Sequence, residues 1–330
     1  MNVIYRGGII GTGSYLPERI LTNQDLEKMV DTSDEWITTR TGIKERRIAD
    51  SDTATSDLAA KAAQNALLNA GLEASEIDLI IVATITPDKN FPSTACIVQS
   101  KIKAYNAVAF DISAACTGFI YGIVIANQFI TTGLYKNILV IGAETLSKFV
   151  DWQDRNTCVL FGDGAGAVVM SKVKEGYGVL AQYLGSDGSG GDTLAIDAGG
   201  SRNPATFETI SQKMHYIRMD GNEVFKFAVK IMASAAEEVV KIAGINKSDV
   251  DFLVPHQANI RIIEAARKRM GLPENRVYVN LERYGNMSAA SIPVALDEAV
   301  NSGAIKSGDN VILVGFGAGL TWGSCLVKWE

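Results

Sequence analysis

Three side chains in this sequence have the types needed for a nucleophilic thiol site: Cys116, His256 and Asn286. Only two histidines occur among the 330 residues, so imidazole chemistry has few places to reside. The cysteine lies in Asp-Ile-Ser-Ala-Ala-Cys-Thr-Gly-Phe, the histidine in Leu-Val-Pro-His-Gln-Ala-Asn and the asparagine in Tyr-Gly-Asn-Met-Ser-Ala-Ala-Ser. A thiol with an imidazole and a carboxamide in reach is a set suited to acyl transfer.

The elements that must position these groups alternate between strand-like and helix-like patterns. The strand-like runs are rich in Val, Ile and Leu without polar alternation, which is typical of parallel strands buried on both faces. Apolar residues at helical spacing predict two helices that end before Gly71 and Gly244, where a left-handed cap residue belongs. We expect strands at Leu79–Thr84, Val108–Ile112, Ile138–Gly142, Ala167–Met170, Phe252–Pro255, Val277–Asn280, Val311–Gly315 and Ser324–Val327.

The two halves of the chain repeat one pattern. The capping glycines Gly71 and Gly244 lie 173 positions apart (244 − 71 = 173), and the strands that follow them keep the same offset. The run Asn137-Ile-Leu-Val-Ile-Gly keeps it again with Asn310-Val-Ile-Leu-Val-Gly. One offset at three places predicts a duplicated α/β unit, whose copies pack about a pseudo-two-fold axis.

The three candidate groups fall where such an architecture places a site. Ligands of open α/β sheets bind at the carboxyl ends of strands, and Cys116, His256 and Asn286 each follow an expected strand. Cys116 also opens a helix of small residues, where free amides and the positive end of the helix dipole favour a thiolate. The remaining cysteines are expected to be small buried hydrophobes; they are Cys96, Cys158 and Cys325.

Composition narrows the class of protein. Residues are 47% hydrophobic and 21% charged, as in an ordinary globular protein, and a net charge of −6 argues against nucleic acid as a partner. No run approaches the roughly 18 apolar residues of a membrane helix, and no basic region followed by a long apolar stretch marks an export signal. Four cysteines make a poor disulfide framework, so we expect a cytoplasmic, reduced protein.

With these residues in place, the chain closely resembles β-ketoacyl-acyl-carrier-protein synthase III, the initiating condensing enzyme of bacterial type II fatty acid synthesis. The resemblance implies a thiolase-like αβαβα sandwich of two similar halves, in agreement with the repeat. An N-terminal half, residues 1–172, would carry the cysteine, and a C-terminal half, residues 173–330, the histidine and asparagine. Matching segments run nearly end to end: 32–42, 111–119, 154–157, 161–167, 221–226, 254–259, 284–291 and 315–323.

The resemblance implies a decarboxylative condensation without any cofactor or metal. Cys116 would take an acyl group from acyl-CoA, and malonyl-acyl carrier protein would then lose carbon dioxide while His256 and Asn286 hold the enolate oxygen. The carbanion would attack the acyl-cysteine and release a β-ketoacyl-carrier protein. Backbone N–H groups of Cys116 and Ala318 would form a second oxyanion hole, in a loop whose glycines permit close approach.

The resemblance also implies a set of binding residues and a homodimer. Coenzyme A would contact Trp36, Arg40 and Arg155, and its pantetheine arm Asn222, Ala258 and Asn259. Arg261 and Lys268 lie seven apart on one helix face, in a basic cluster with Arg267 and Arg269, and would dock an acidic carrier protein. Phe91 would reach the acyl pocket of the partner subunit, and the segment Ala107–Ile112 would pair the two subunits.

Two residues depart from the family pattern. Thr117 follows the cysteine where a small alanine is familiar, and Met287 follows the asparagine where threonine is familiar. Both are expected to alter the shape of the acyl pocket. The glycine clusters Gly11-Thr-Gly13 and Gly162–Gly166 do not complete a dinucleotide-binding pattern and are interpreted as close-packing sites.

Several other functions share parts of this pattern. A papain-type hydrolase uses Cys, His and Asn in the same order but needs a local signature that is absent here. Elongating synthases of the same fold use two histidines in the site, and His215 lacks a matching context. Closer rivals are other thiolase-fold acyltransferases of secondary metabolism with a different acceptor. A non-catalytic scaffold is the third class, against which the intact triad argues.

Overall fold

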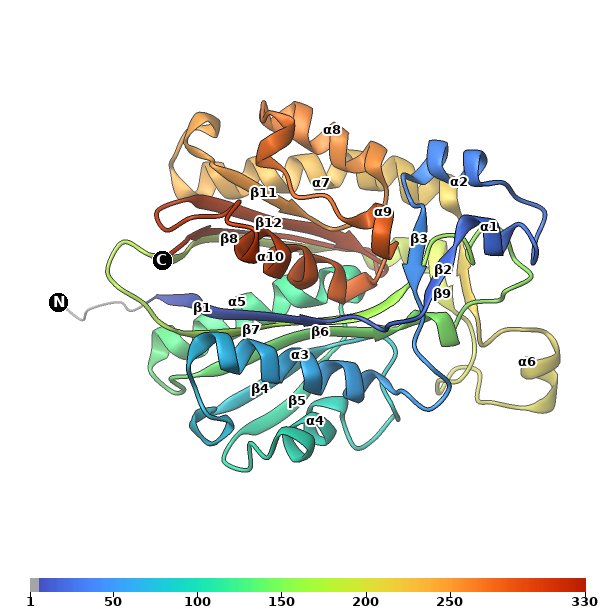
Figure 1. The fold of residues 1–330 in the computed structure, drawn as a ribbon, viewed down its shortest axis with the longest axis horizontal. Helices are drawn as coiled ribbons and strands as arrows, with labels where there is room; N and C mark the ends of the chain where they lie inside the picture. The colour runs from blue at the N-terminus through green and yellow to red at the C-terminus, as the bar shows by residue number, and fades with distance from the viewer. Residues whose placement is uncertain (1–5) are drawn as a thin grey trace.

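The structure, a computed structural model, describes residues 6–330 and has five layers, in which three helical layers alternate with two sheets (Figure 1). Three large hydrophobic clusters lie between the layers. One packs outer helices on the first sheet, one lies between the two sheets, and one packs outer helices on the second sheet. Residues 1–5, on which the expectation of no export signal partly rests, lie outside the described residues.

The first sheet has the strand order β1-β7-β6-β4-β5. Strand β4 pairs in parallel with both neighbours, β5 and β6, while β7 runs antiparallel to β6 and to β1. Every residue of β4 and β6 is buried, as the continuous apolar runs predict. The strands span β1 Gly7–Tyr15, β4 Leu79–Ala83, β5 Val108–Ile112, β6 Ile138–Thr145 and β7 Asp163–Lys172.

The second sheet repeats this plan without an equivalent of β5. Its order β8-β13-β12-β11 matches β1-β7-β6-β4, with one parallel pair at the β11 end and antiparallel pairs elsewhere. The strands span β8 Gly178–Ser186, β11 Phe252–Pro255, β12 Asn310–Gly317 and β13 Thr321–Lys328. Gly71 and Gly244 have φ angles of 66° and 69° and both end a helix, as predicted. The duplication is therefore present in the fold, and a boundary between residues 172 and 173 stays a prediction.

The helices cover and separate the sheets according to their apolar faces. Helices α3 and α4 cover the first sheet, and α7 and α8 cover the second. Between the sheets lie α5 and α10, packed on both. Their bounds are α3 Thr55–Ala70, α4 Thr94–Ile102, α5 Gly118–Thr132, α7 Gly221–Ala243, α8 Ile260–Met270 and α10 Ser291–Asn301.

The glycine clusters serve close packing, as the sequence predicts. A Cβ added to Gly11 would lie 2.6 Å from the carbonyl oxygen of Ala66 in α3. One added to Gly166 would lie 2.6 Å from the backbone nitrogen of Val294 in α10. Neither cluster therefore needs a bound phosphate to explain it.

Helix α5 and the turn before it are apolar around their whole circumference because they lie between two sheets. By length and composition alone, Ala115–Thr132 would be long enough to cross a membrane, and the expectation that no segment comes near this length was wrong. In the structure 67% of this segment is buried inside the fold, which identifies it as a core helix.

One expected strand, Val277–Asn280, is absent as a strand. Only a single bridge joins Val277 to Leu253 of β11. The side chain of Gln257 takes over the pairing, because its Nε2 donates to the Tyr278 carbonyl and its Oε1 accepts from the Asn280 N–H. A buried amide side chain thus replaces a sheet ladder at this edge.

Short elements surround the carboxyl ends of the central strands. They come from two insertions, one between β1 and α3 and one between β8 and α7. A further short helix precedes Asn286. These elements are β2 Ile20–Thr22, α1 Asn23–Leu26, α2 Asp34–Thr41, β3 Glu45–Arg47, β9 Leu194–Ile196, α6 Phe207–Ser211, β10 Ile217–Met219 and α9 Leu281–Tyr284.

Candidate active site

Cys116 lies in a short 3-10 turn, Ala115–Thr117, directly before α5. The turn is entered through Ala115 with φ of 46°, a conformation that alanine adopts only under strong constraint from its surroundings. A constraint is visible at Gly317, where an added Cβ would lie 2.7 Å from the Cys116 backbone nitrogen. The sequence therefore brings the end of β12 against the nucleophile turn by placing glycine there.

Burial sets the protonation state of this cysteine. Its side chain is 6% exposed, and burial raises the pKa of the Cys116 thiol to about 12, with a further increase from the nearby charge of Glu144. Burial therefore opposes the thiolate that the start of the helix favours, because desolvation disfavours the charged form. The resting residue is a thiol, and the nearby Ser288 side chain lowers its pKa only in part.

His256 contributes a neutral imidazole whose ring nitrogens are unused by the protein. The residue is buried, and its backbone N–H donates to the Val314 carbonyl of β12 at 2.8 Å. Among the described residues neither ring nitrogen has a hydrogen-bond partner. Burial lowers the pKa of His256 to about 3, so the ring carries one N–H donor and one acceptor. Buried nitrogens without partners are costly and point to a ligand.

Asn286 is oriented by its own backbone and by the next turn. Its N–H donates to the Leu160 carbonyl at 2.8 Å, and its carbonyl accepts from Gly162 at 3.1 Å. The side-chain Oδ1 accepts the Ser288 N–H at 2.8 Å. Because the oxygen is used in this way, the Nδ2 group remains as a donor.

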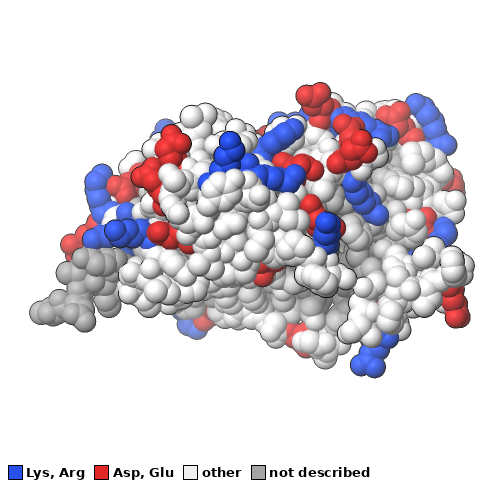
Figure 2. All heavy atoms as spheres, turned by 90° about the horizontal axis from the view of Figure 1, so that it is seen from below, with Lys and Arg blue, Asp and Glu red and all other residues white. Residues whose placement is uncertain are grey.

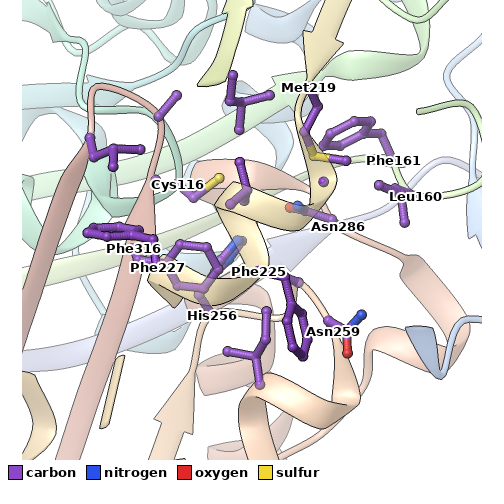
Figure 3. A pocket seen from close by; sticks show the side chains of 18 residues that line it. Cys116, Leu160, Phe161, Met219, Phe225, Phe227, His256, Asn259, Asn286 and Phe316 are labelled. Carbon is purple, nitrogen blue, oxygen red and sulfur yellow. The ribbon is translucent and has the colours of Figure 1, made fainter. Parts of the chain in front are cut away.

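The three side chains line one pocket of ≈ 670 Å³, although they are far apart in sequence. Figure 3 shows the sulfur of Cys116, the ring of His256 and the amide of Asn286 directed toward the same space. The pocket wall is otherwise mostly apolar, with aromatic side chains from α7 and β12. Ala318, expected to supply the second N–H of an oxyanion hole, lines the pocket beside Gly317.

A second pocket of ≈ 710 Å³ also reaches Cys116 and is almost wholly apolar. Its walls include Ile85, Leu146, Ile196 and Ile217, from four separate segments. No pattern in the sequence predicts this pocket. Thr117 and Met287 line neither pocket, so neither forms a pocket wall directly, and an effect of either residue on the shape of the acyl pocket stays a prediction. Both are buried in packing behind the site.

Two segments of the chain match a known family. A family described as 3-oxoacyl-[acyl-carrier-protein (ACP)] synthase III matches residues 110–188, and its C-terminal counterpart matches residues 240–329. A β-ketoacyl-[acyl-carrier-protein] synthase III from Caldanaerobacter subterraneus subsp. tengcongensis is 65% identical over 323 residues, covering 98% of both chains. The protein of that name from Clostridioides difficile is 61% identical over 98% of both chains.

This chain belongs to the β-ketoacyl-acyl-carrier-protein synthase III family. The crystal structure of 3-oxoacyl-[acyl-carrier-protein] synthase III from Aquifex aeolicus superposes with a TM-score of 0.91 at 52% identity, covering 98% of this chain and all of that one. The Thermus thermophilus structure gives 0.91 at 49% identity over 98% and 99% of the chains. The predicted family and its thiolase-like fold are thereby confirmed.

The residues expected to hold coenzyme A in this family form one cluster. The Trp36 ring in α2 has the Arg40 guanidinium 4.7 Å and the Arg155 guanidinium 4.9 Å from its centre. Arg155 also donates to the Asp31 carbonyl at 2.6 Å. An indole flanked by two guanidinium groups offers a stacking face and phosphate-binding donors together.

The residues expected along the pantetheine path are only partly in place. Ala258 and Asn259 line the pocket of Cys116, and the Asn259 side chain donates to the Arg40 carbonyl at 2.9 Å. This bond connects the pocket to the Trp36 cluster. Asn222 does not line the pocket; it is exposed in the first turn of α7, beside the lining residue Gly221.

The basic helix α8 carries less available charge than the sequence suggests. Arg267 binds Glu264 through its guanidinium, and Arg269 pairs with Glu237 at 2.6 Å, so neither adds to an open basic cluster. Arg261 and Lys268 are exposed, and among the described residues neither takes part in an ion pair. The Arg261 guanidinium lies 4.9 Å from the ring centre of the pocket residue Phe225.

Of the remaining predictions, those for Cys158, Cys325 and His215 agree with the structure, and the one for Cys96 does not. Phe91 is 84% exposed and lines neither pocket of its own chain. Cys158 and Cys325 are buried as expected, whereas Cys96 is exposed and the prediction for it was wrong. His215 bonds to the Thr209 hydroxyl at 2.9 Å, away from the Cys116 pocket, in agreement with a structural role.

Sequence reasoning did not identify Glu144, a buried acid beside the site. Glu144, at the end of β6, is fully buried and accepts the hydroxyl of Thr86 at 2.6 Å and that of Thr84 at 3.2 Å. Burial raises the pKa of Glu144 to about 7. Ser288 borders both Glu144 and Cys116. The 173-residue offset could have found Ser288, since it is the counterpart of Ala115 in the nucleophile turn.

Proposed function

We propose that this protein condenses an acyl-CoA primer with malonyl-acyl carrier protein and so initiates fatty acid synthesis. The single observation that carries this proposal is the pairing of two neutral donors, the His256 ring and the Asn286 amide, in the pocket of Cys116. A hydrolase needs a base that activates water, whereas an enolate oxygen needs neutral N–H donors aimed at it. The names of the most similar relatives support the same reaction.

The first half-reaction is acyl transfer to sulfur. Burial holds the proton on the Cys116 thiol, so the nucleophile forms only as the thioester enters the pocket. The new carbon–sulfur bond forms on Cys116 as the bond to coenzyme A breaks, and the thiol proton leaves with coenzyme A. Backbone N–H groups of Cys116 and Ala318 hold the carbonyl oxygen. The apolar pocket lined by Ile85, Leu146 and Ile217 receives the acyl chain.

The second half-reaction is decarboxylative condensation. The malonyl thioester loses carbon dioxide, and the electron pair of the broken bond becomes an enolate whose oxygen is held by His256 and Asn286. The enolate carbon attacks the acyl carbonyl, the sulfur of Cys116 leaves, and it regains a proton. Because the two donors are neutral and desolvated, they bind the developing negative charge more strongly than water does.

We propose that the two substrates share one entrance. The adenine and phosphates of coenzyme A bind the cluster of Trp36, Arg40 and Arg155, and the acidic carrier protein docks on Arg261 and Lys268. Asn259 supports the reading of a common path, because it touches both the pocket and the Trp36 cluster. The pantetheine arm, common to both substrates, passes Ala258 and Asn259, with Asn222 at the outer end.

We propose a homodimer that works in the cytoplasm without a resident cofactor or metal. Strand β5 is the edge of its sheet, and Val108 on it is 48% exposed. Figure 2 views the molecule from the side of α4 and β5, where a broad area lacks charged side chains. An open strand edge beside uncharged surface favours pairing with a second copy. Phe91, close to β5 in the fold, then extends toward the partner's acyl pocket.

The proposal is tested by steady-state assay with acetyl-CoA and malonyl-carrier protein, and with the same primer offered to amine, hydroxyl and water acceptors. The expected product is acetoacetyl-carrier protein with one carbon dioxide released per turnover. Transfer to another acceptor in preference to malonyl-carrier protein would identify a thiolase-fold acyltransferase of secondary metabolism. Formation of acetate alone would identify a hydrolase.

A further inference from the structure

Thr117, the residue after the nucleophile, faces away from both pockets and into a hydroxyl pair. Its side chain is fully buried, its Oγ lies 2.7 Å from the Ala114 carbonyl, and it lies 2.6 Å from the Oγ of Thr321. Thr321 in turn lies 3.0 Å from the Ala114 carbonyl and 3.1 Å from the Ala318 carbonyl. The pair therefore contacts the backbone on both sides of the oxyanion hole proposed above.

The two contacted segments belong to different halves of the protein. Thr117 lies in the turn that carries Cys116, before α5. Thr321 is the first residue of β13 and pairs with Gly317, on the far side of a three-residue loop that contains Ala318. Backbone ladders hold each segment in its own half. The hydroxyl groups of Thr117 and Thr321 join these two segments through a side-chain hydrogen bond, and the Thr321 Oγ also lies 3.0 Å from the Ala114 carbonyl beside the turn.

The geometry of the hydroxyl groups makes the connection obligatory. Each threonine has one hydroxyl proton, and the available acceptors are the two carbonyls and the other hydroxyl. At 2.6 Å the two Oγ atoms share a proton. Either Thr117 donates to Thr321, which donates to the Ala114 or the Ala318 carbonyl, or Thr321 donates to Thr117, which donates to the Ala114 carbonyl. In either chain the short Oγ–Oγ contact joins the nucleophile turn to the loop.

We propose that Thr117 and Thr321 are positioning residues that fix the separation of the Cys116 and Ala318 N–H groups, and hence the oxyanion hole for acyl transfer. This inference rests on the proposed function. The contact at Gly317 supports it, because the Cys116 backbone nitrogen there approaches closely enough to exclude any Cβ, so a small loop shift changes the hole. Neither threonine touches the acyl group or His256, so the effect acts through backbone position alone.

The test is the isosteric variant Thr117→Val, which removes the hydroxyl and keeps the volume. We expect its kcat for acyl-enzyme formation from acetyl-CoA to fall about 10-fold with KM unchanged, since a small misplacement of preorganised donors lowers the rate of the chemical step. Release of carbon dioxide from malonyl-carrier protein without primer is expected to stay at the wild-type rate, because His256 and Asn286 hold that oxygen. Thr117→Ser is expected to restore acylation to near wild type.

The partner residue and a matched control complete the design. Thr321→Val is expected to show the same split with a loss at least as large, because it also removes the contact of Thr321 with the Ala114 carbonyl. The double variant is expected to lose no more than Thr321→Val, because both changes break the Thr117–Thr321 link. Ser324→Ala, three residues along the same strand, removes a buried hydroxyl bonded to the Ala235 carbonyl at 2.7 Å. It reports the cost of a buried hydroxyl without a link to the site, and we expect its acylation rate to stay unchanged. Thermal unfolding of each variant confirms that it is folded.

The outcomes separate this inference from the function on which it rests. Unchanged acylation in Thr117→Val and Thr321→Val would overturn the positioning role. An equal loss in acylation and in primer-free release of carbon dioxide would also overturn it, and so would additive effects in the double variant. Failure of the wild-type protein to form any acyl-cysteine would instead overturn the proposed function. A fall in acylation alone, with rescue by Thr117→Ser, supports the inference.

Discussion

The nucleophile turn Ala115–Thr117 and its counterpart Ser288–Ala290 are one structure used in two ways. They lie 173 positions apart, both are single 3-10 turns that lead into a helix between the sheets, and both begin at positive φ, 46° and 44°. The first carries Cys116 and opens onto two pockets, whereas the second carries Ala289 in its place. Duplication therefore supplied the backbone twice and the nucleophile once.

The strand ends that face these turns differ in the same way. Gly317 of β12 approaches the Cys116 nitrogen, while its counterpart 173 positions earlier is Glu144, a buried acid beside Ser288. Glycine on one side leaves room for a substrate oxygen beside the backbone N–H groups. Glutamate on the other side fills the space and binds Thr84 and Thr86. One copy of the duplicated unit is open for chemistry, and the other supports it.

The largest effect is expected when the thiol is removed from the first turn and placed in the second, which tests directly whether the two turns differ in function. Cys116→Ala is expected to lower acyl transfer on the order of 10⁴-fold or more while leaving the fold intact. Adding Ala289→Cys to that variant is expected to restore nothing, because Ala289 itself lines neither pocket. Acyl-enzyme in intact mass spectra measures both. Recovery of label on position 289 would show that the two turns are equivalent.

The variant Asn286→Ala is expected to affect the rate of condensation and not the rate of acylation. Removing the free amide donor is expected to slow condensation roughly 10²- to 10³-fold and leave acylation near wild type, because only the enolate oxygen uses this donor. Acyl-enzyme should then accumulate after addition of malonyl-carrier protein. Equal losses in both steps would place Asn286 in the general support of the pocket.

The supporting role of Glu144 predicts a pH dependence of stability. Its pKa is raised from 4.5 to about 7 by burial, so the native state binds the proton more tightly than the unfolded chain. The wild type is therefore destabilised as pH rises from the unfolded value through the folded one. Relative to Glu144→Gln, we expect it to lose about 3 kcal/mol between pH 4.5 and pH 8.

Urea unfolding of the wild type and Glu144→Gln at several pH values measures this difference. The variant Glu18→Gln, at an exposed position, reports the effect of removing one surface charge. A difference between wild type and Glu144→Gln that stays constant from pH 4.5 to pH 8 would show that Glu144 titrates normally and that burial does not govern it.

The smallest expected effect concerns docking of the carrier protein on α8. Arg261→Glu is expected to raise the KM for malonyl-carrier protein on the order of 10-fold at low salt, with a much smaller change for acyl-CoA. Lys306→Glu is the matched control, because Lys306 is exposed just before β12, at the strand end opposite the site. Equal changes for both substrates, or an equal effect of the control, would contradict a docking role for α8.

Sequence reasoning found what is encoded in local periodicity and in repeated spacing. The two capping glycines, the buried strands and the 173-residue offset all rest on such signals, and the structure bears them out. It failed for Val277–Asn280 because the side chain of Gln257, distant in sequence, took over the backbone pairing. Hydrogen bonds made by a remote side chain leave no mark on local hydrophobic pattern.

The protonation state of Cys116 and the shape of the apolar pocket could not be predicted from the sequence for a related reason. The thiolate expected at Cys116 followed from the start of a helix, but the depth of burial that reverses the shift comes from both halves of the fold. The apolar pocket draws on Ile85, Leu146, Ile196 and Ile217, none of which is unusual in its own segment. Likewise, the pairing of Thr117 with Thr321 spans 204 positions.

Mapping of the acyl group in a single turnover tests the central claim most directly. The protein is mixed with labelled acetyl-CoA, sampled, then mixed with malonyl-carrier protein and sampled again, and digests are analysed for the labelled peptide. The account predicts label on the peptide of Cys116 alone, which disappears as labelled acetoacetyl-carrier protein forms. Label on any other residue, or its loss from Cys116 as free acetate, would contradict the account.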